Sequence, residues 1–186
     1  MSPAAVRAAV PSSRNRILWL RREGSSDEIM APFCVDGKTV YQPGYRQICW
    51  VMRDRNIATA QGYVQIDIVE VEALWEVQQA LALHGIRQPL VITSGYRSPQ
   101  TNAAIENAAR NSMHCYAKAA DMYVEGVSTR ELFATCWSRA VSGGIGYYDS
   151  HVHLDSGTRR WWVGDLEVPS FGTFGGACVG EPAHLA

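Results

Sequence analysis

The chain has 186 residues, of which 47% are hydrophobic, and its formal net charge is −1. This length favours a single domain with a buried core, and the near-neutral charge gives no reason to expect binding to nucleic acid or to an anionic membrane surface. No apolar run approaches the roughly 18–20 residues that cross a bilayer, so we expect no membrane span.

The first residues differ in composition from the rest of the chain. Residues 1–15 are rich in Ala, Pro, Ser and Arg and are expected to be disordered, which leaves 16–186 as one domain. They contain positive charges but lack the apolar stretch of about 7–15 residues that a complete signal peptide needs. Arg21 and Arg22 form a twin-arginine pair, but polar residues follow them, which argues against an export signal.

Strand and helix signals alternate in the first part of the domain. Residues 16–20 read as a short strand, and an Asp-Gly pair predicts a hairpin turn within residues 35–41. Apolar residues at helical spacing predict a helix over residues 44–54.

A second helix has clear signals at both of its ends. Asp67 is a suitable N-cap, and Glu70 stands three residues later, where it would complete a capping box. Apolar residues recur with helical spacing as far as Leu83, and Gly85 follows. We therefore predict an amphipathic helix that ends at this glycine.

The central part of the chain alternates in the same way. Residues 89–94 read as a buried strand, and Ser98 with the following proline predicts a helix over residues 99–109. Residues 119–124 form the next strand candidate. Ser128 and Glu131 make a capping box for a helix that continues to about residue 140.

Glycine-rich turns and two further strands close the domain. A turn and a strand are predicted within residues 142–148, a second strand within 151–157, and an irregular tail over the last 20 residues. Together these elements predict an α+β fold, in which several helices pack on a small, mostly antiparallel sheet that holds the site.

The stretch from Thr93 to Asp155 concentrates groups that bind metals. His114, Asp121 and His153 lie in two motifs flanked by glycine turns. Two histidines and one carboxylate are a ligand set for Zn²⁺, and a catalytic zinc keeps a fourth position open for water. The pattern favours a zinc hydrolase.

The last of these motifs has the alternation of a strand that carries an active site. His151, His153 and Asp155 would share one face, because residues two apart point the same way. Val152 and Leu154 would face the core. Asp155 has a second interpretation, in which it caps the turn that follows, and His151 could be a surface histidine.

A buried strand leads into the segment that contains Arg97. Its guanidinium would face an anion, such as a peptide carboxylate or the oxyanion of a tetrahedral intermediate, or would brace the loop instead. Tyr96 and Tyr116 either line the same pocket or pack in the interior.

The segments SGYRSPQTN, SMHCYAKAAD and GIGYYDSHVHLDSGTRRWW resemble the M15 zinc peptidases, in particular their MepK-like murein endopeptidase branch. The resemblance covers residues 16 to about 163 and implies the M15 or hedgehog-like peptidase fold. It implies that His114, Asp121 and His153 bind one Zn²⁺ and that Arg97 stabilises the substrate or transition state. Ser112 matches the serine two residues before the first ligand, where it would support that ligand, and we also count it with Tyr96 and Tyr116 as a substrate-binding residue.

Two departures from the family pattern concern the catalytic chemistry. Ala117 replaces a glycine, which a negative φ would tolerate, although its methyl group could narrow the cleft. Ser150 stands where other branches carry an acidic base. We therefore rank His151 first as general base, because its ordinary pKa suits the task, with Asp155 second and Asp149 third.

The resemblance implies a murein endopeptidase that hydrolyses D,D or L,D stem-peptide cross-links, with carboxypeptidase activity as a further option. Such an enzyme acts in the periplasm or is otherwise exported, and the branch includes enzymes associated with a secretion apparatus. The alternative is a domain that binds murein or a partner protein around a structural zinc.

Cysteine chemistry is the least favoured interpretation. The five cysteines include no CxxC pair, so a cysteine-rich zinc site is not expected. Cys115 stands next to His114, but adjacent residues rarely face each other as nucleophile and base.

Overall fold

The computed structural model describes residues 14–106, 108–139 and 143–164, and one eight-stranded sheet runs through them. The strands are β1 (Arg16–Arg22), β2 (Glu28–Val35), β3 (Thr39–Val40), β4 (Leu90–Ser94), β5 (Ala119–Tyr123), β6 (Gly144–Tyr147), β7 (Val152–Asp155) and β8 (Arg160–Val163). Their order is β3-β2-β1-β4-β5-β7-β6-β8. The β1–β4 and β6–β8 pairs are parallel and the other pairs are antiparallel, which confirms a mostly antiparallel sheet.

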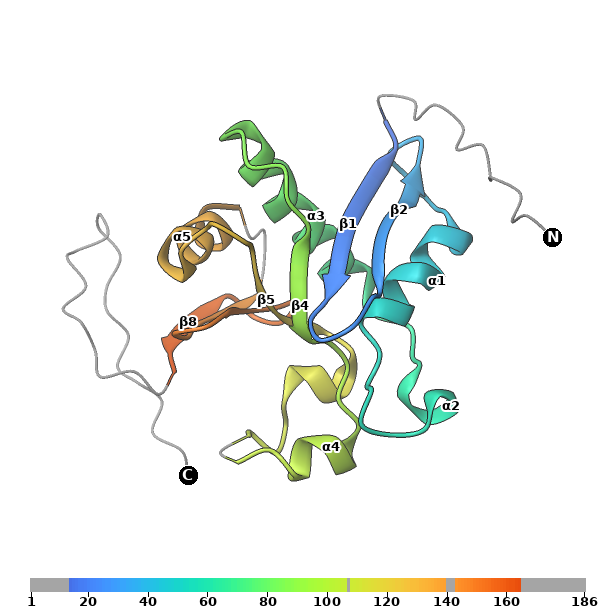
Figure 1. Ribbon diagram of the computed structural model, residues 1–186, viewed down its shortest axis with the longest axis vertical. Coiled ribbons are helices and arrows are strands. Elements are labelled where there is room, and N and C mark those ends of the chain that lie inside the picture. Colours follow the sequence, from blue (N-terminus) through green and yellow to red (C-terminus); the bar gives the residue numbers. More distant parts are fainter. Residues whose placement is uncertain (1–13, 107, 140–142, 165–186) are drawn as a thin grey trace.

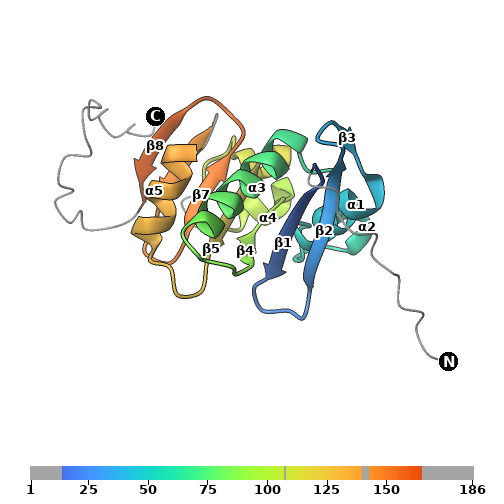
Figure 2. The same ribbon diagram turned by 90° about the horizontal axis from the view of Figure 1, so that it is seen from above.

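Helices complete the α+β architecture that the sequence predicts. They are α1 (Gln42–Val51), α2 (Thr59–Gly62), α3 (Ile68–Leu83), α4 (Pro99–Ala103), the 3-10 helix η1 (Met113–Tyr116) and α5 (Thr129–Arg139). Helix α1 packs on β1 and β2, whereas α3 and α5 contact each other and cover the sheet beside β4, β5 and β7 (Figure 2). Helix α4 lies beyond the end of β4 (Figure 1).

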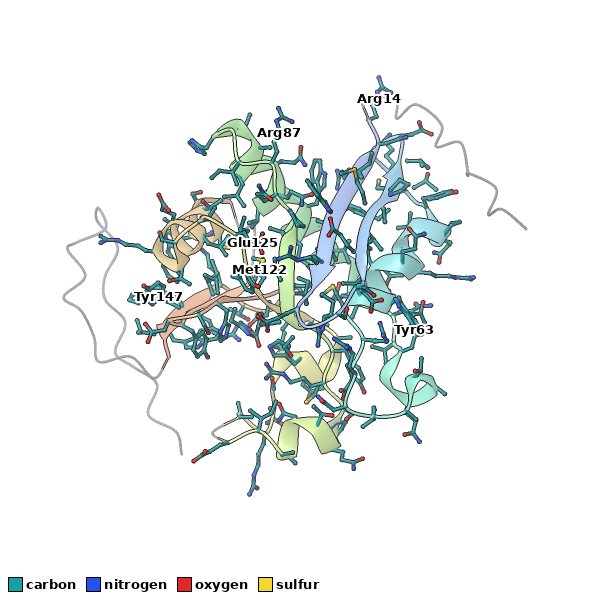
Figure 3. The ribbon with its side chains drawn as sticks, in the orientation of Figure 1. Arg14, Tyr63, Arg87, Met122, Glu125 and Tyr147 are labelled. Atoms are coloured by element: carbon teal, nitrogen blue, oxygen red, sulfur yellow. The ribbon has the colours of Figure 1, made fainter. Side chains whose placement is uncertain are left out.

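The core lies between the sheet and these helices. Met122 on β5 is fully buried and lies near the middle of the molecule, whereas the exposed Arg87 lies at its edge (Figure 3). On β7, Val152 and Leu154 are fully buried, as the alternation predicts. None of the helices in the described ranges has both the length and the apolarity that a membrane crossing requires.

Local signals placed most of the elements correctly. The Asp36-Gly37 pair joins β2 to β3 with φ values of 55° and 70°, the positive values of the predicted hairpin turn. Ser128 and Glu131 form the predicted capping box, since each backbone N–H donates to the side chain of the other residue. Helix α3 ends before Gly85, which has a φ of 81°.

Several elements differ from the sequence-based expectations, among them η1, which was not predicted. Helix α4 ends at Ala103 instead of continuing to residue 109, because the chain turns back and Asn102 Nδ2 donates to Ala109 O over 2.9 Å. Helix α2 and strand β8 were not predicted, since four residues are too few to show a period. The expectations for residues 1–13 and for the C-terminal tail beyond residue 164 lie outside the described residues.

Glu70 does not make the capping box predicted for the start of α3. Asp67 caps the helix by accepting from Val69 N over 2.9 Å, but the Glu70 carboxyl is fully buried, and neither of its oxygens has a hydrogen-bond partner in the described structure. Glu70 lies on the same face of α3 as the buried Leu74 and Val77, so tertiary packing draws it inward.

Glu70 is expected to make the protein less stable as the pH rises. Burial raises the pKa of Glu70 well above its usual range, so the folded chain holds a proton that the unfolded chain has already lost. The free energy of unfolding therefore decreases as the pH rises above about 4.3, the ordinary glutamate value. Glu70→Leu is expected to stabilise the protein at pH 7 by about 2 kcal/mol, as measured by denaturant titration.

The matched control is Glu70→Gln, which keeps a buried polar group but cannot titrate. The difference in the free energy of unfolding between wild type and this variant is expected to change between about pH 4.5 and pH 8, because the two proteins differ in only one titratable group, Glu70. A difference that stays constant over this range would contradict the protonated, buried state of Glu70.

Candidate metal centre

His114, Asp121 and His153 come together at one buried point. Each offers one ligand atom, and these three atoms lie within 4.8 Å of one another. His114 is on η1, Asp121 on β5 and His153 on β7, where the antiparallel register pairs Asp121 directly with His153. Asp121 and His153, 32 positions apart, thus meet because β5 and β7 are neighbours, and His114, seven positions before Asp121, reaches them from η1.

The separations of the three donor atoms fit a small cation. Asp121 Oδ1 lies 3.2 Å from His114 Nε2 and 2.8 Å from His153 Nδ1, and the two nitrogens are 3.1 Å apart. Tetrahedral zinc with Zn–N bonds of about 2.0–2.1 Å would hold its ligand atoms roughly 3.3 Å apart. The cluster is slightly tighter than this value.

Each histidine ring has one nitrogen that points toward the cluster and one that points away from it. The hydrogen bond of the nitrogen that points away determines whether the other nitrogen can act as an acceptor. His114 Nδ1 donates to the carbonyl oxygen of Gly95 over 2.6 Å, and His153 Nε2 donates to Asp155 Oδ2 over 3.2 Å. When both rings are neutral, the two inward nitrogens carry lone pairs, and they face each other and a carboxylate oxygen. Burial tends to lower the pKa of His153, but its hydrogen bonds to Asp121 and Asp155 raise it, so a proton on His153 can lie between these atoms. A metal ion would take the place of that proton, and the donor set fits one.

Local structure places His114 for this role. Ser112 caps η1, because its Oγ accepts from His114 N over 3.4 Å. Gly95 lies so close to Met52 that an added Cβ would come within 2.3 Å of the Met52 carbonyl oxygen. Only glycine therefore allows the chain to present its carbonyl to His114 at this point.

Arg97 holds the second oxygen of Asp121. Its Nη2 donates to Asp121 Oδ2, and its Nε donates to Ser94 Oγ over 2.7 Å. Burial tends to raise the pKa of Asp121, but the two histidines hold it well below its usual range. Asp121 is thus an ionised carboxylate with one oxygen on Arg97 and the other in the cluster.

Asp155 is not free to act as a base. It is fully buried, and its oxygens accept hydrogen bonds from His153, from Arg160 and from the backbone N–H groups of Gly144 and Gly157. Burial tends to raise its pKa, but these hydrogen bonds hold it below the usual range. The close contact between the Gly144 backbone and the Asp155 carboxylate requires glycine at position 144, because an added Cβ would come within 2.5 Å of Asp155 Oδ2.

Asp155→Asn is expected to weaken metal binding without removing a ligand. The amide is a weaker acceptor from His153 and loses the ion pair with Arg160, so the His153 ring is held less firmly. We expect the affinity for Zn²⁺ to fall roughly 10–100-fold, as measured by competition with a chromogenic chelator.

Asp149→Asn is the matched control, because Asp149 is exposed in the loop between β6 and β7 and lies outside the cavity. Its zinc affinity should equal that of the wild type. Equal affinities for all three proteins would contradict an orienting role for Asp155.

The cluster opens into a cavity of about 830 Å³. Its wall includes all three cluster residues and four further residues that the sequence indicated, Tyr96, Arg97, Ser112 and His151. Tyr116 is 60% exposed and does not belong to this wall, and its role as a substrate-binding residue stays a prediction. Asp149, the third candidate base, is also outside.

His151 lies on the cavity wall but is held differently from the prediction. Strand β7 begins at Val152, so the alternation of the strand does not place His151. Its ring stacks on Tyr148 with centroids 4.5 Å apart, and its Nδ1 lies 3.1 Å from Ser150 Oγ. Burial lowers the pKa of His151, which keeps the ring neutral at pH 7.

Several wall residues were not indicated by the sequence. Trp162 lies 5.1 Å from His153 between ring centroids and donates its indole N–H to Tyr148 Oη over 3.0 Å. Arg160 pairs with Asp155, and Arg22 enters the wall from β1. The sequence marked Arg160 and Trp162 only as part of the RRWW run and Arg22 only as part of the twin-arginine pair, and neither pattern separates wall residues from core residues.

Ala117 stands at the end of η1 with a φ of 57°, so the condition of a negative φ is not met. Its methyl group does not narrow the cavity, because Ala117 is not part of the wall. The residue instead bears backbone strain, since a left-handed conformation costs roughly 1–2 kcal/mol for a residue with a Cβ.

Ala117→Gly is therefore expected to stabilise the fold. The relieved strain exceeds the extra entropy of glycine in the unfolded chain, which leaves a gain of about 0.5–1 kcal/mol in thermal or chemical unfolding. Ala119→Gly, two residues on in the regular strand β5, should destabilise the protein instead. A loss of stability in both variants would contradict the strain.

Cys115 shows no features of a nucleophile. Burial raises the pKa of its thiol, and Cys115 is not part of the cavity wall. A thiol in this state holds little thiolate at neutral pH, which disfavours a cysteine enzyme.

Comparison with known proteins gives consistent matches. The model of an M15 peptidase family, described as peptidoglycan L,D-endopeptidase MepK, matches residues 10–162. The peptidoglycan L,D-endopeptidases MepK of Escherichia coli strain K12 and of Shigella flexneri are each 31% identical over 166 residues. These alignments cover 86% of this chain and 87% of each relative.

Proposed function

Because the chain belongs to the M15 peptidase family of the peptidoglycan L,D-endopeptidase MepK, we propose that it is a zinc-dependent murein endopeptidase. The observation that carries the proposal is the cluster of His114, Asp121 and His153, whose inward lone pairs face one another at the wall of a large cavity. A peptidase needs such a centre where a substrate can reach it.

Zinc would be held by His114 Nε2, Asp121 Oδ1 and His153 Nδ1, because hydrogen bonds to Gly95 and Asp155 leave these ring nitrogens as acceptors. Three protein ligands are the number found in catalytic zinc sites. When bound, zinc polarises the scissile carbonyl and lowers the pKa of a water to about 7.

His151 is the proposed general base. With its Nδ1–H donated to Ser150 Oγ, its Nε2 keeps a lone pair that can accept a proton from the attacking water. Stacking on Tyr148 holds the ring in the wall, and its lowered pKa keeps it unprotonated. The same nitrogen can then return the proton to the leaving amine.

Arg97 is proposed to act on both the centre and the substrate. One of its N–H groups holds Asp121, and its guanidinium belongs to the cavity wall, where positive charge stabilises the oxygen of the scissile carbonyl as negative charge develops. Tyr96 and Ser112 in the same wall would contact the peptide.

The substrate is proposed to be a stem-peptide cross-link of peptidoglycan. The relatives are named L,D-endopeptidases, so we place the L,D cross-link first and the D,D cross-link second, with carboxypeptidase activity as a minor reaction. Because this substrate lies outside the cytoplasm, we propose that the protein acts in the periplasm or is otherwise exported.

Digestion of purified murein sacculi tests this function. Zinc-loaded wild type should convert cross-linked dimers into monomers, with fragment masses that identify the bond, whereas His114→Ala should leave dimers intact. Dimers that survive the zinc-loaded wild type would reject the peptidase and favour a binding domain with a structural zinc.

A further inference from the structure

Arg22, the last residue of β1, brings a partly buried positive charge into the wall of the cavity. Its Nη1 is buried and has no hydrogen-bond partner in the described part of the chain. Burial, with repulsion from Arg55 and Arg53, lowers its pKa to about 10. Such an arrangement is unfavourable in the free protein, because a desolvated guanidinium normally has an anionic or hydrogen-bonding partner.

The nearby acidic groups do not supply that partner. Asp54 Oδ1 accepts from Asn56 N over 2.9 Å and Asp54 Oδ2 accepts from Ser98 N over 2.8 Å, so its oxygens point to the backbone. Glu23 is exposed, and its effect on the Arg22 pKa is weaker than that of the two arginines. Neither carboxyl group therefore forms a hydrogen bond or an ion pair with Arg22 in the described residues.

The sheet places Arg22 at the same end as the metal centre. Strands β1 and β4 are parallel, and Arg22 pairs with Ile92, two residues before Ser94, which itself pairs with Asp121. The path from Arg22 to Asp121 crosses from β1 to β4, follows β4 for two residues and crosses to β5. The two backbones are therefore separated by about 12 Å. Three to four residues of an extended peptide cover that distance, at roughly 3.3–3.6 Å each.

We propose that Arg22 is a specificity-determining residue that binds a free carboxylate of the stem peptide beside the bond to be cleaved. The inference rests on the proposed function, because it takes a murein peptide as the ligand. A carboxylate in the cavity matches the planar fork of the Arg22 guanidinium, and its charge would offset the repulsion from Arg53 and Arg55.

The kinetic test uses two cross-linked dimers, one with free diaminopimelate carboxylates and one with those carboxylates amidated. For the wild type, amidation is expected to lower kcat/KM roughly 10–100-fold, mainly through KM, because a charged hydrogen bond is lost. Arg22→Gln should show the same loss on the free acid and no further loss on the amide. Arg22→Lys should recover part of the discrimination.

Arg87→Gln is the matched control. Arg87 is exposed, lies outside the cavity wall, carries the same charge and is not among the groups that act on Arg22, so its removal should leave the discrimination between the two dimers unchanged. Thermal unfolding checks the fold of each variant, and Arg22→Gln should be no less stable than the wild type. If Arg22→Gln discriminates as the wild type does, or loses the same factor on both dimers, the proposal is overturned.

A binding measurement separates this proposal from the proposed function. The non-cross-linked tripeptide L-Ala–γ-D-Glu–diaminopimelate is titrated calorimetrically, with the free and the amidated carboxylate. If the wild type cleaves neither dimer but prefers the free acid in an Arg22-dependent manner, the peptidase fails and the carboxylate site stands. If Arg22→Gln binds both peptides as the wild type does, the carboxylate site is rejected, whatever the activity.

Discussion

His114→Ala is expected to abolish zinc retention and to lower peptidase activity at least about 1,000-fold, because it removes one of the three donors of the cluster and leaves the other two unable to hold the ion. Metal content after dialysis against a weak chelator, determined by elemental analysis, should fall from one zinc per chain to near zero. Hydrolysis of a cross-linked dimer is measured on the same samples.

His84→Ala is the matched control for this change. His84 is exposed at the end of α3 and does not belong to the cavity wall. This variant should retain one zinc and full activity. The ligand assignment would be wrong if His114→Ala kept its zinc, and the catalytic role of zinc would be wrong if that variant lost its zinc but kept its activity.

His151→Ala is expected to separate metal binding from catalysis. The variant should keep one zinc per chain, since His151 is not among the three clustered residues. Its kcat should fall about 10²–10⁴-fold, the range typical of a lost general base, while KM changes little. Steady-state kinetics on a cross-linked dimer, with zinc content determined in parallel, checks both parts.

Ser150→Ala serves as the companion variant. It removes the hydroxyl group beside His151 Nδ1 but leaves the ring and its stacking on Tyr148 in place, so a smaller loss of kcat is expected. If His151→Ala kept its full kcat, the base would have to be another group of the cavity wall. The proposed zinc ligands would be unaffected by that result.

The candidate centre could be named from the sequence because its motifs are short and each combines ligand types with local structure. His114 precedes a predicted strand, Asp121 lies within it, and His153 alternates with buried apolar residues. The structure brings these three residues together, and their role as zinc ligands stays a prediction.

The surroundings of the centre could not be predicted in the same way, because they depend on contacts between distant elements. The carbonyl of Gly95 orients the His114 ring by accepting its hydrogen bond, and Arg160 forms an ion pair with Asp155. Neither contact corresponds to a periodic pattern or a local motif in the sequence from which it could be predicted. The rank of Asp155 as a candidate base reflected this gap, since its five-residue separation from Arg160 gave no sign that the carboxylate is fully engaged.

The predicted turn and helix caps formed where local chemistry alone decides, and one predicted cap failed where burial decides. The turn at Asp36 and the cap at Ser128 depend on the chain within four residues, and both formed as predicted. Glu70 had an equally good local pattern for a capping box, but its face of α3 is the one that packs into the core. The packing of that face was not visible in the local pattern.

The most direct test of the account is zinc titration of metal-depleted protein with a purified L,D-cross-linked dimer as substrate. We predict no hydrolysis without metal and a linear rise in activity that reaches its plateau at one zinc per chain. Full occupancy of the site with the dimer still intact would contradict the account.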